Sequence, residues 1–218
     1  MFGFRKHLAG LLFDRRHNIE TNRNVVRDDL TGMPSRIRQH AGDYSPTNPA
    51  LFARIVGESG ADPRDFSFVD LGSGKGRVVI AAASYGFQRI VGIEADSVLH
   101  EIAENNIARA GLKRSANVSL VHGDARTAEL PAGNLFIFMY SPFRGPVFKA
   151  VAKRLAVLAS EPQRAMIIAY SGDWEADALE RTGKFIRRRM RRRQLWARST
   201  VSLFYNEAAG RIGQGSAC

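Results

Sequence analysis

The 218-residue sequence contains one cysteine, Cys218 at its last position, together with eight prolines and five scattered histidines. A single cysteine excludes an internal disulfide framework and a zinc site built on cysteines, and it fits a reducing compartment. None of the histidines has an acidic residue at metal-ligand spacing, so we expect no metal site. Eight prolines are too few for a disordered or repetitive chain, whereas a hydrophobic content of 44% can bury one good core.

Long hydrophobic runs are also missing. The apolar patch at residues 8–13 follows basic residues, as the core of a signal peptide does, but it is only six residues long and ends at Asp14-Arg15-Arg16. It is shorter than a secretory core and far shorter than a membrane span. We therefore expect a cytoplasmic protein with no membrane span.

Acidic residues are scarce, with 21 Asp and Glu against 32 Lys and Arg, which gives a formal net charge of +11. The densest basic segment is 181–198, and no acid occurs from 181 through 206. One interpretation is a surface for nucleic acid, because a positive field attracts polyanions. The other is an edge strand, with Ile186 and Met190 on one apolar face and charges that prevent edge-to-edge pairing. The composition leaves both interpretations open.

Glycines are concentrated in the run from Phe66 to Arg77, where an apolar strand ends in Gly72, Gly74 and Gly76 and leads into an apolar helix. Glycine lets the backbone take a positive φ and approach a ligand closely. The amides at the start of the following helix then face that ligand. The run therefore predicts a loop that binds a nucleotide-like cofactor.

The spacing of these glycines decides between known loops. A phosphate-binding P-loop needs Gly, four residues and then Gly-Lys-Ser/Thr, but here Lys75 is followed by Gly76, and Val69 stands five residues before Gly74. The dinucleotide fingerprint needs a third glycine at the position of Arg77. An NAD-linked oxidoreductase is therefore a weaker candidate.

The pattern Asp70-x-Gly72-x-Gly74-x-Gly76 resembles the first motif of the class I S-adenosylmethionine (SAM) methyltransferases. Downstream, Glu94 ends a second strand-like run 22 residues after Gly72, where an acid can accept both ribose hydroxyls. In this family, an acid at the position of Asp124 accepts from the adenine amino group. The resemblance implies S-adenosyl-L-methionine as the cofactor, with these candidate binding residues: Asp70, Gly72, Ser73, Gly74, Gly76, Glu94, Asp124 and Ala125.

From Phe66 onward, β-like and α-like runs alternate, which indicates an α/β fold. The expected strands are 66–71, 89–94, 117–122, 134–140, 165–170, 184–193 and 199–205, and the expected helices are 76–86, 97–110, 145–159 and 173–182. A short helix is expected at 51–56, capped by Asn48 or Thr47. We expect Lys75 and Arg77 to face solvent or to start a helix.

The resemblance covers 66–205 and implies a Rossmann-like seven-stranded class I methyltransferase sheet with helices on both faces. Its strand order would be three-two-one-four-five-seven-six, with the seventh strand antiparallel and the arginine-rich strand at the edge. Residues 1–65 would form a partly helical N-terminal extension that acts as a cofactor lid or substrate-binding segment, and 206–218 a C-terminal tail.

The glycine run, together with Gly92-Ile-Glu94, is similar to a small bacterial group of these enzymes with weak similarity to seven-strand protein-lysine methyltransferases. The upstream segments Phe13-Asp-Arg-Arg-His17 and Tyr44-Ser-Pro-Thr47 also fit this group. In the lysine enzymes a Tyr-x-Pro segment lies over the cofactor. This implies cofactor contacts for Tyr44 and Thr47.

The fourth strand ends in Tyr140-Ser141-Pro142-Phe143, at the sheet edge where open α/β proteins bind ligands. These four residues are the catalytic candidates, and Tyr140 or the carbonyl or hydroxyl of Ser141 could guide a proton from an amine. We expect methyl transfer to a protein amine (lysine) or a small molecule. Alternatives are an RNA methyltransferase that uses the basic segment 181–198 and a non-catalytic module that binds SAM or nucleic acid.

Overall fold

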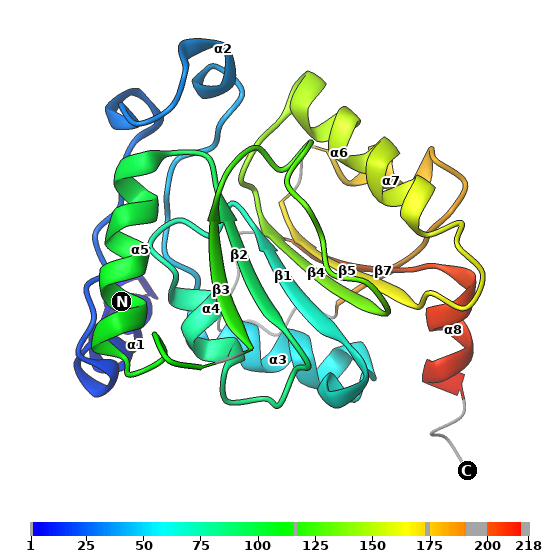
Figure 1. Cartoon of the computed structure of the whole chain (residues 1–218), viewed down its shortest axis with the longest axis horizontal. Helices are drawn as coiled ribbons and strands as arrows, with labels where there is room; N and C mark the ends of the chain where they lie inside the picture. Colours follow the sequence, from blue (N-terminus) through cyan, green and yellow to red (C-terminus); the bar gives the residue numbers. More distant parts are fainter. Residues whose placement is uncertain (1, 116, 173–174, 191–199, 215–218) are drawn as a thin grey trace.

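The computed structural model describes residues 2–115, 117–172, 175–190 and 200–214. Within them the chain forms one seven-stranded sheet in the order β3-β2-β1-β4-β5-β7-β6, in which β7 runs antiparallel to β5 and β6 (Figure 1). The strands are β1 (Ser67–Leu71), β2 (Ile90–Glu94), β3 (Val118–His122), β4 (Leu135–Tyr140), β5 (Met166–Ser171), β6 (Ile186–Arg189) and β7 (Val201–Tyr205). The predicted fold, strand order and antiparallel seventh strand are confirmed.

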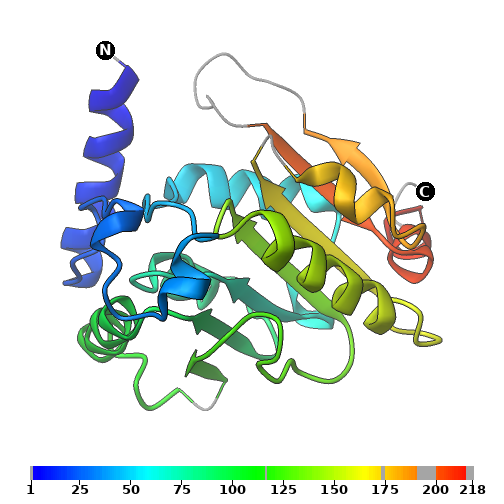
Figure 2. The same cartoon turned by 90° about the horizontal axis from the view of Figure 1, so that it is seen from above.

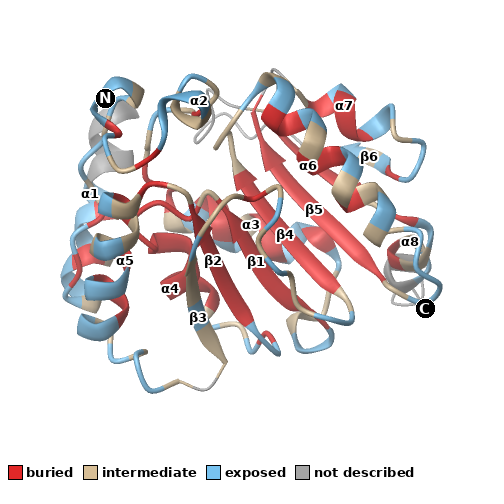
Figure 3. Cartoon of the chain, turned by 45° about the horizontal axis from the view of Figure 1, so that its top comes forward, coloured by how far each residue is buried: buried red, intermediate tan, exposed pale blue. Residues whose placement is uncertain are grey.

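Helices cover both faces of this sheet. Alternate residues of a strand face opposite sides, so β1 contributes Phe68 to one core and Val69 and Leu71 to the other. The first core is closed by α3 (Pro49–Ser59), α4 (Arg77–Ala82), α5 (Ser97–Arg109) and α8 (Glu207–Gln214), and the second by α6 (Gly145–Leu158) and α7 (Ala176–Glu180). Because both faces are covered, the central strands are buried along their length, as Figure 3 shows.

Helix boundaries follow the local capping chemistry. The Asn48 side chain accepts from the Ala50 amide at 2.8 Å and Pro49 occupies the first turn, so the predicted cap of α3 is confirmed, although the helix is longer than the expected 51–56. Asp96 caps α5 by accepting from the Leu99 amide at 3.0 Å.

The predicted extension packs onto the sheet. It contains α1 (Phe2–His17), the 3-10 turns η1 (Arg27–Asp29) and η2 (Pro63–Asp65), α2 (Ser35–Arg38) and α3. Phe52 and Ile55 of α3 are completely enclosed in the same core as Phe68. Figure 2 shows α1 at one side of the molecule, with the blue segment that follows it reaching toward the central strands. Isolated bridges pair Val25 with Tyr44 and Ala41 with Phe143, so this segment lies against the loop after β4.

Several element predictions need correction. The helices expected at 76–86 and 173–182 are shorter, as α4 and α7, and residues 173–174 lie outside the described part. The arginine-rich strand is at the sheet edge as expected, but Ile186 is 77% exposed and does not join an apolar face with Met190, which packs against the core. The strand expected at 184–193 is shorter, as β6, and residues 191–199 lie outside the described residues. The expected tail begins with α8, whose Ala209 is buried.

Candidate cofactor site

A cavity opens at the carboxyl ends of β1, β2 and β4, where parallel sheets bind their ligands. It has about 900 Å³ of free space, its opening to solvent included. Four loops of the sheet and the N-terminal segment around 30–47 form its walls. The predicted candidates that line it are Tyr44, Thr47, Asp70, Gly72, Ser73, Gly74, Glu94, Asp124, Ala125, Tyr140, Pro142 and Phe143, whereas Gly76 and Ser141 do not.

The glycine loop is the floor of this cavity. Gly72, Gly74 and Gly76 have φ of +83°, +53° and +80°, which residues with a side chain rarely adopt. A Cβ on Gly72 would lie 2.3 Å from Pro142, and one on Gly74 would lie 2.3 Å from the Tyr44 ring. The first two glycines are therefore required both for their backbone conformation and for space.

Glu94 holds the loop from the side of β2. Its Oε2 accepts from the Gly74 amide at 2.7 Å, and its Oε1 accepts from the amides of Ala95 and Asp96, both at 2.9 Å. Burial raises the pKa of Glu94, although these amide bonds act in the opposite direction. A carboxylate has about four acceptor positions, so it can also accept from a ligand hydroxyl.

Asp70 lies beneath the same loop and is 3% exposed. Burial, and secondarily the charge of Glu94, raises its pKa well above the ordinary value. It lines the cavity, where a carboxylate can accept from a bound ligand, and the raised pKa favours the protonated form, which can also donate.

Asp124 lies at the rim of the cavity and is already partnered. Its Oδ1 accepts from the amide and the Nε of Arg126 at 2.8 and 3.0 Å, and the two side chains form an ion pair. This side-chain bond is the main reason that the pKa of Asp124 is lowered. An adenine amino group would therefore share Asp124 with Arg126.

The loop after β4 brings the catalytic candidates to the cavity with one exception. Tyr140, Pro142 and Phe143 line it, but the Ser141 hydroxyl donates to the Ser171 carbonyl of β5 at 2.7 Å. Ser141 also has a positive φ of +46°. The hydroxyl's own proton is thus used within the sheet, and the roles expected for the Ser141 carbonyl and for Tyr140 stay predictions.

The N-terminal segment forms the opposite wall. Tyr44 packs its ring against Gly74 and donates its hydroxyl to the Thr21 carbonyl at 2.8 Å. Burial is the main cause that raises the pKa of Tyr44. An apolar cluster continues this wall toward α5 and offers a surface for a flat ring: Leu30, Met33, Ala41 and Leu99.

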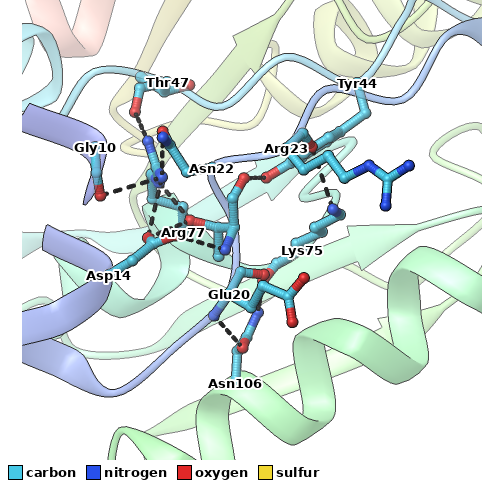
Figure 4. A network of polar contacts seen from close by, with 11 residues as sticks. Gly10, Asp14, Glu20, Asn22, Arg23, Tyr44, Thr47, Lys75, Arg77 and Asn106 are labelled. Carbon is cyan, nitrogen blue, oxygen red and sulfur yellow. Dashed lines mark hydrogen bonds and ion pairs between the residues drawn. The ribbon is translucent and has the colours of Figure 1, made fainter. Parts of the chain in front are cut away.

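Lys75 and Arg77 are buried at 4% exposure each, so of the two alternatives expected for them the solvent-facing one is wrong, while the helix-start one is confirmed for Arg77. Arg77 begins α4 and reaches into the N-terminal segment, where it pairs with Asp14 at 3.0 Å (Figure 4). The trace of this pair in the sequence is Asp14, an acid that directly follows the apolar patch at residues 8–13.

These walls fit S-adenosylmethionine. The glycine floor admits close approach of a ligand, the acids Glu94 and Asp124 are acceptors for hydroxyl and amino groups, and Asp70 lies between them and β4. Among the described residues, no group of three His, Cys, Asp or Glu side chains is placed to hold a metal ion. No described helix is long and apolar enough to cross a membrane.

Comparison with known proteins agrees with this geometry. Residues 68–159 match the family model of a methyltransferase domain. The ribosomal protein L11 methyltransferase of Desulfosudis oleivorans is 28% identical over 124 residues, which are 53% of this chain but only 41% of that protein. The chain therefore spans less than half of this curated relative.

Two solved structures show the fold. The human methyltransferase 10 domain containing protein has a TM-score of 0.59 at 13% identity, over 93% of this chain and 96% of that chain. SMU.472, solved in complex with S-adenosylhomocysteine, has a TM-score of 0.54 at 18% identity, over 74% of this chain and 52% of that chain. Residues 68–159 therefore form a methyltransferase domain, and the glycine loop and the sheet order are those of the class I S-adenosylmethionine-dependent methyltransferase fold.

Proposed function

We propose that the chain methylates a protein amine, the side chain of a lysine. The observation that carries this proposal is the contact between two loops. Pro142 of the loop after β4 packs directly on Gly72 of the glycine loop, so the acceptor candidates and the cofactor candidates share one cavity.

The wall on the β4 side suits a lysine side chain. Tyr140, Pro142, Phe143 and Val147 line it with apolar and aromatic surface. Such a surface can pack against the four methylenes of lysine. An amine with an ordinary pKa near 10.4 must lose a proton before it attacks, and an apolar environment favours the neutral form.

The residues of the chain contribute to methyl transfer by positioning the donor and the acceptor. The glycine loop and Glu94 orient the donor, and the Tyr44 wall keeps water away from it. S-adenosylmethionine, when bound, supplies a methyl group already activated by its sulfonium. Placement of this kind can lower the barrier by several kcal/mol, so no catalytic triad is needed.

The relative supports a protein acceptor. The name of the Desulfosudis enzyme states that it acts on a ribosomal protein. We extend only the acceptor class to this chain, since the match spans less than half of that enzyme.

The basic edge gives less support to an RNA acceptor. Arg187 is paired with Asp177 and Glu180 at 3.1 and 3.3 Å. Arg188 is bonded to the Tyr205 hydroxyl and the Glu58 carbonyl. These described arginines hold the edge of the sheet together and do not line the cavity.

The test is transfer of labelled methyl from SAM into a cell extract fractionated into protein, RNA and small molecules. We expect label in protein that resists ribonuclease and is recovered as methyl-lysine after hydrolysis. The Gly72→Ala variant, whose Cβ would meet Pro142, should lose at least about 90% of the incorporation. The control Gly60→Ala has the same positive-φ strain in open space and should keep it. Label in RNA or in small molecules that follows the same variant pattern would contradict the protein acceptor.

A further inference from the structure

The buried Arg77 is bonded to the N-terminal segment at each of its three nitrogens (Figure 4). Its Nε donates to the Thr21 hydroxyl at 2.5 Å. Its other contacts are the Thr47 carbonyl at 3.3 Å, Asp14 Oδ1 at 3.0 Å, Asn22 Oδ1 at 3.2 Å and the Gly10 carbonyl at 3.5 Å. We call Arg77 with Asp14, Thr21 and Thr47 the arginine clamp.

Thr21 is the junction of the clamp and is completely buried. Asp14 accepts from both its hydroxyl and its amide, at 2.6 and 2.7 Å, while the same hydroxyl accepts from Arg77. Its carbonyl accepts from the Tyr44 hydroxyl. Arg77 is therefore linked through one residue to the aromatic ring that covers the cavity.

The contacts close into a ring around the glycine loop. Tyr44 packs on Gly74, Tyr44 is bonded to Thr21, and Thr21 is bonded to Arg77, three residues after Gly74. The clamp also holds Thr47 by its carbonyl, and both Tyr44 and Thr47 line the cavity. Arg77 also lines the cavity, so a change there would alter the wall both directly and through its bonds to Thr21 and Thr47.

A second attachment of this segment does not involve Arg77. Asn106 of α5 bonds the amide and carbonyl of Glu20 at 2.9 and 3.2 Å and the Lys75 carbonyl at 3.0 Å. Lys75 itself donates to the Arg23 carbonyl at 3.2 Å. Residues 20–23 are therefore held by Asn106 and Lys75, whereas the Thr47 carbonyl is bonded to Arg77.

Burial of an ion pair is a costly way to gain stability, because desolvation offsets much of the attraction. We propose that Arg77 is a positioning residue for the cofactor site: through the arginine clamp it fixes Tyr44 and Thr47 as the second wall, so that the cavity is formed before the ligand arrives. This does not depend on the identity of the methyl acceptor. By linkage, a ligand that needs this wall must in turn stabilise the N-terminal segment.

The mildest test removes one hydroxyl. Tyr44→Phe keeps the ring on Gly74 but loses the bond to Thr21, and we expect S-adenosylhomocysteine to bind about 2- to 10-fold more weakly by calorimetry. Tyr205→Phe is the control. Its hydroxyl likewise donates to a backbone carbonyl within residues 1–65, that of Ser59, but neither residue lines the cavity. Its affinity should stay unchanged.

A second test changes the clamp itself. Arg77→Lys retains a charge for Asp14 but loses the forked contacts. Arg187→Lys is the matched control, a 10% exposed arginine side chain paired with two acids at the sheet edge. Both should lower the Tm. Only Arg77→Lys should weaken S-adenosylhomocysteine binding by about 10-fold or more and abolish the protection that the ligand gives against trypsin cleavage at the exposed Arg36.

The outcomes separate positioning from a purely structural role. If folded Arg77→Lys, checked by circular dichroism, binds S-adenosylhomocysteine within twofold of the wild type, the proposal is overturned. If Arg77→Lys does not fold, Tyr44→Phe decides, and an affinity within twofold of the wild type would overturn it equally.

Discussion

Asp70 is a buried acid that lines the cavity and whose ionisation costs stability. It is enclosed beneath the glycine loop and close enough to Glu94 for that charge to raise its pKa. An acid whose pKa is higher in the folded protein holds its proton more tightly there than in the unfolded chain. Stability therefore falls as the pH rises from the unfolded value toward the folded value.

This sign gives a pH-dependent prediction. Asp70→Asn mimics the protonated acid, so its Tm should exceed that of the wild type at pH 8. The gain should be about 2–4 °C for each 1 kcal/mol that ionisation of Asp70 costs the folded protein, and it should disappear near pH 4. Its affinity for S-adenosylhomocysteine should fall, because the carboxyl lines the cavity. Thermal unfolding from pH 4 to 8 measures the first effect.

The control for this experiment is an acid whose pKa is shifted in the opposite direction. Arg64 lowers the pKa of the exposed Asp62 to about 2 by hydrogen bonding. Asp62→Asn should therefore lose a small amount of stability at neutral pH, and this loss should fade below pH 4. A Tm gain in Asp70→Asn that is the same at every pH would show that charge burial is not its cause.

At the scale of elements, Asn206 joins three of them. This buried side chain makes four bonds: it accepts from the amides of Met166 and Ala209 at 2.9 and 3.0 Å and donates to the carbonyls of Ala159 and Arg164 at 3.1 and 2.7 Å. The starts of β5 and α8 and the end of α6 are therefore fixed together.

Asn206→Ala should lower the free energy of unfolding by about 3 kcal/mol, since it leaves several buried backbone groups without a partner. Asn105→Ala, an exposed position on α5, should change it by less than about 0.5 kcal/mol. Urea unfolding measures both. If Asn206→Ala changes the free energy of unfolding as little as the control does, water replaces the lost hydrogen bonds and the Asn206 junction does not stabilise the fold.

The elements were predictable where local chemistry sets them. The strands are buried apolar runs, and the capping residues of α3 and α5 are visible in the sequence. The burial of Arg77 was not predictable, because its acceptors lie up to 67 positions away. The hydrogen bond of the Ser141 hydroxyl was not predictable either, because its acceptor is the Ser171 carbonyl of a neighbouring strand. The order of the strands followed from the family resemblance and not from periodicity.

At the scale of the whole molecule, the cofactor cavity lies between two parts of the chain. The sheet supplies the glycine loop and the acids, and the N-terminal segment supplies Tyr44, Thr47 and the apolar cluster with Leu30 and Met33. The motif at 70–76 alone is therefore only half of the site. The other half reaches it through the arginine clamp and through the pairing of Ala41 with Phe143.

The most direct measurement of this account is calorimetric titration of S-adenosylhomocysteine, with NAD as a second ligand. We predict one S-adenosylhomocysteine site per chain and no NAD binding. Gly74→Ala, which would drive a Cβ into Tyr44, should bind at least about 30-fold more weakly, while Gly133→Ala, with a φ of +79° in open space, should bind as the wild type does. Binding of NAD in place of S-adenosylhomocysteine, or full affinity in folded Gly74→Ala, would contradict the account.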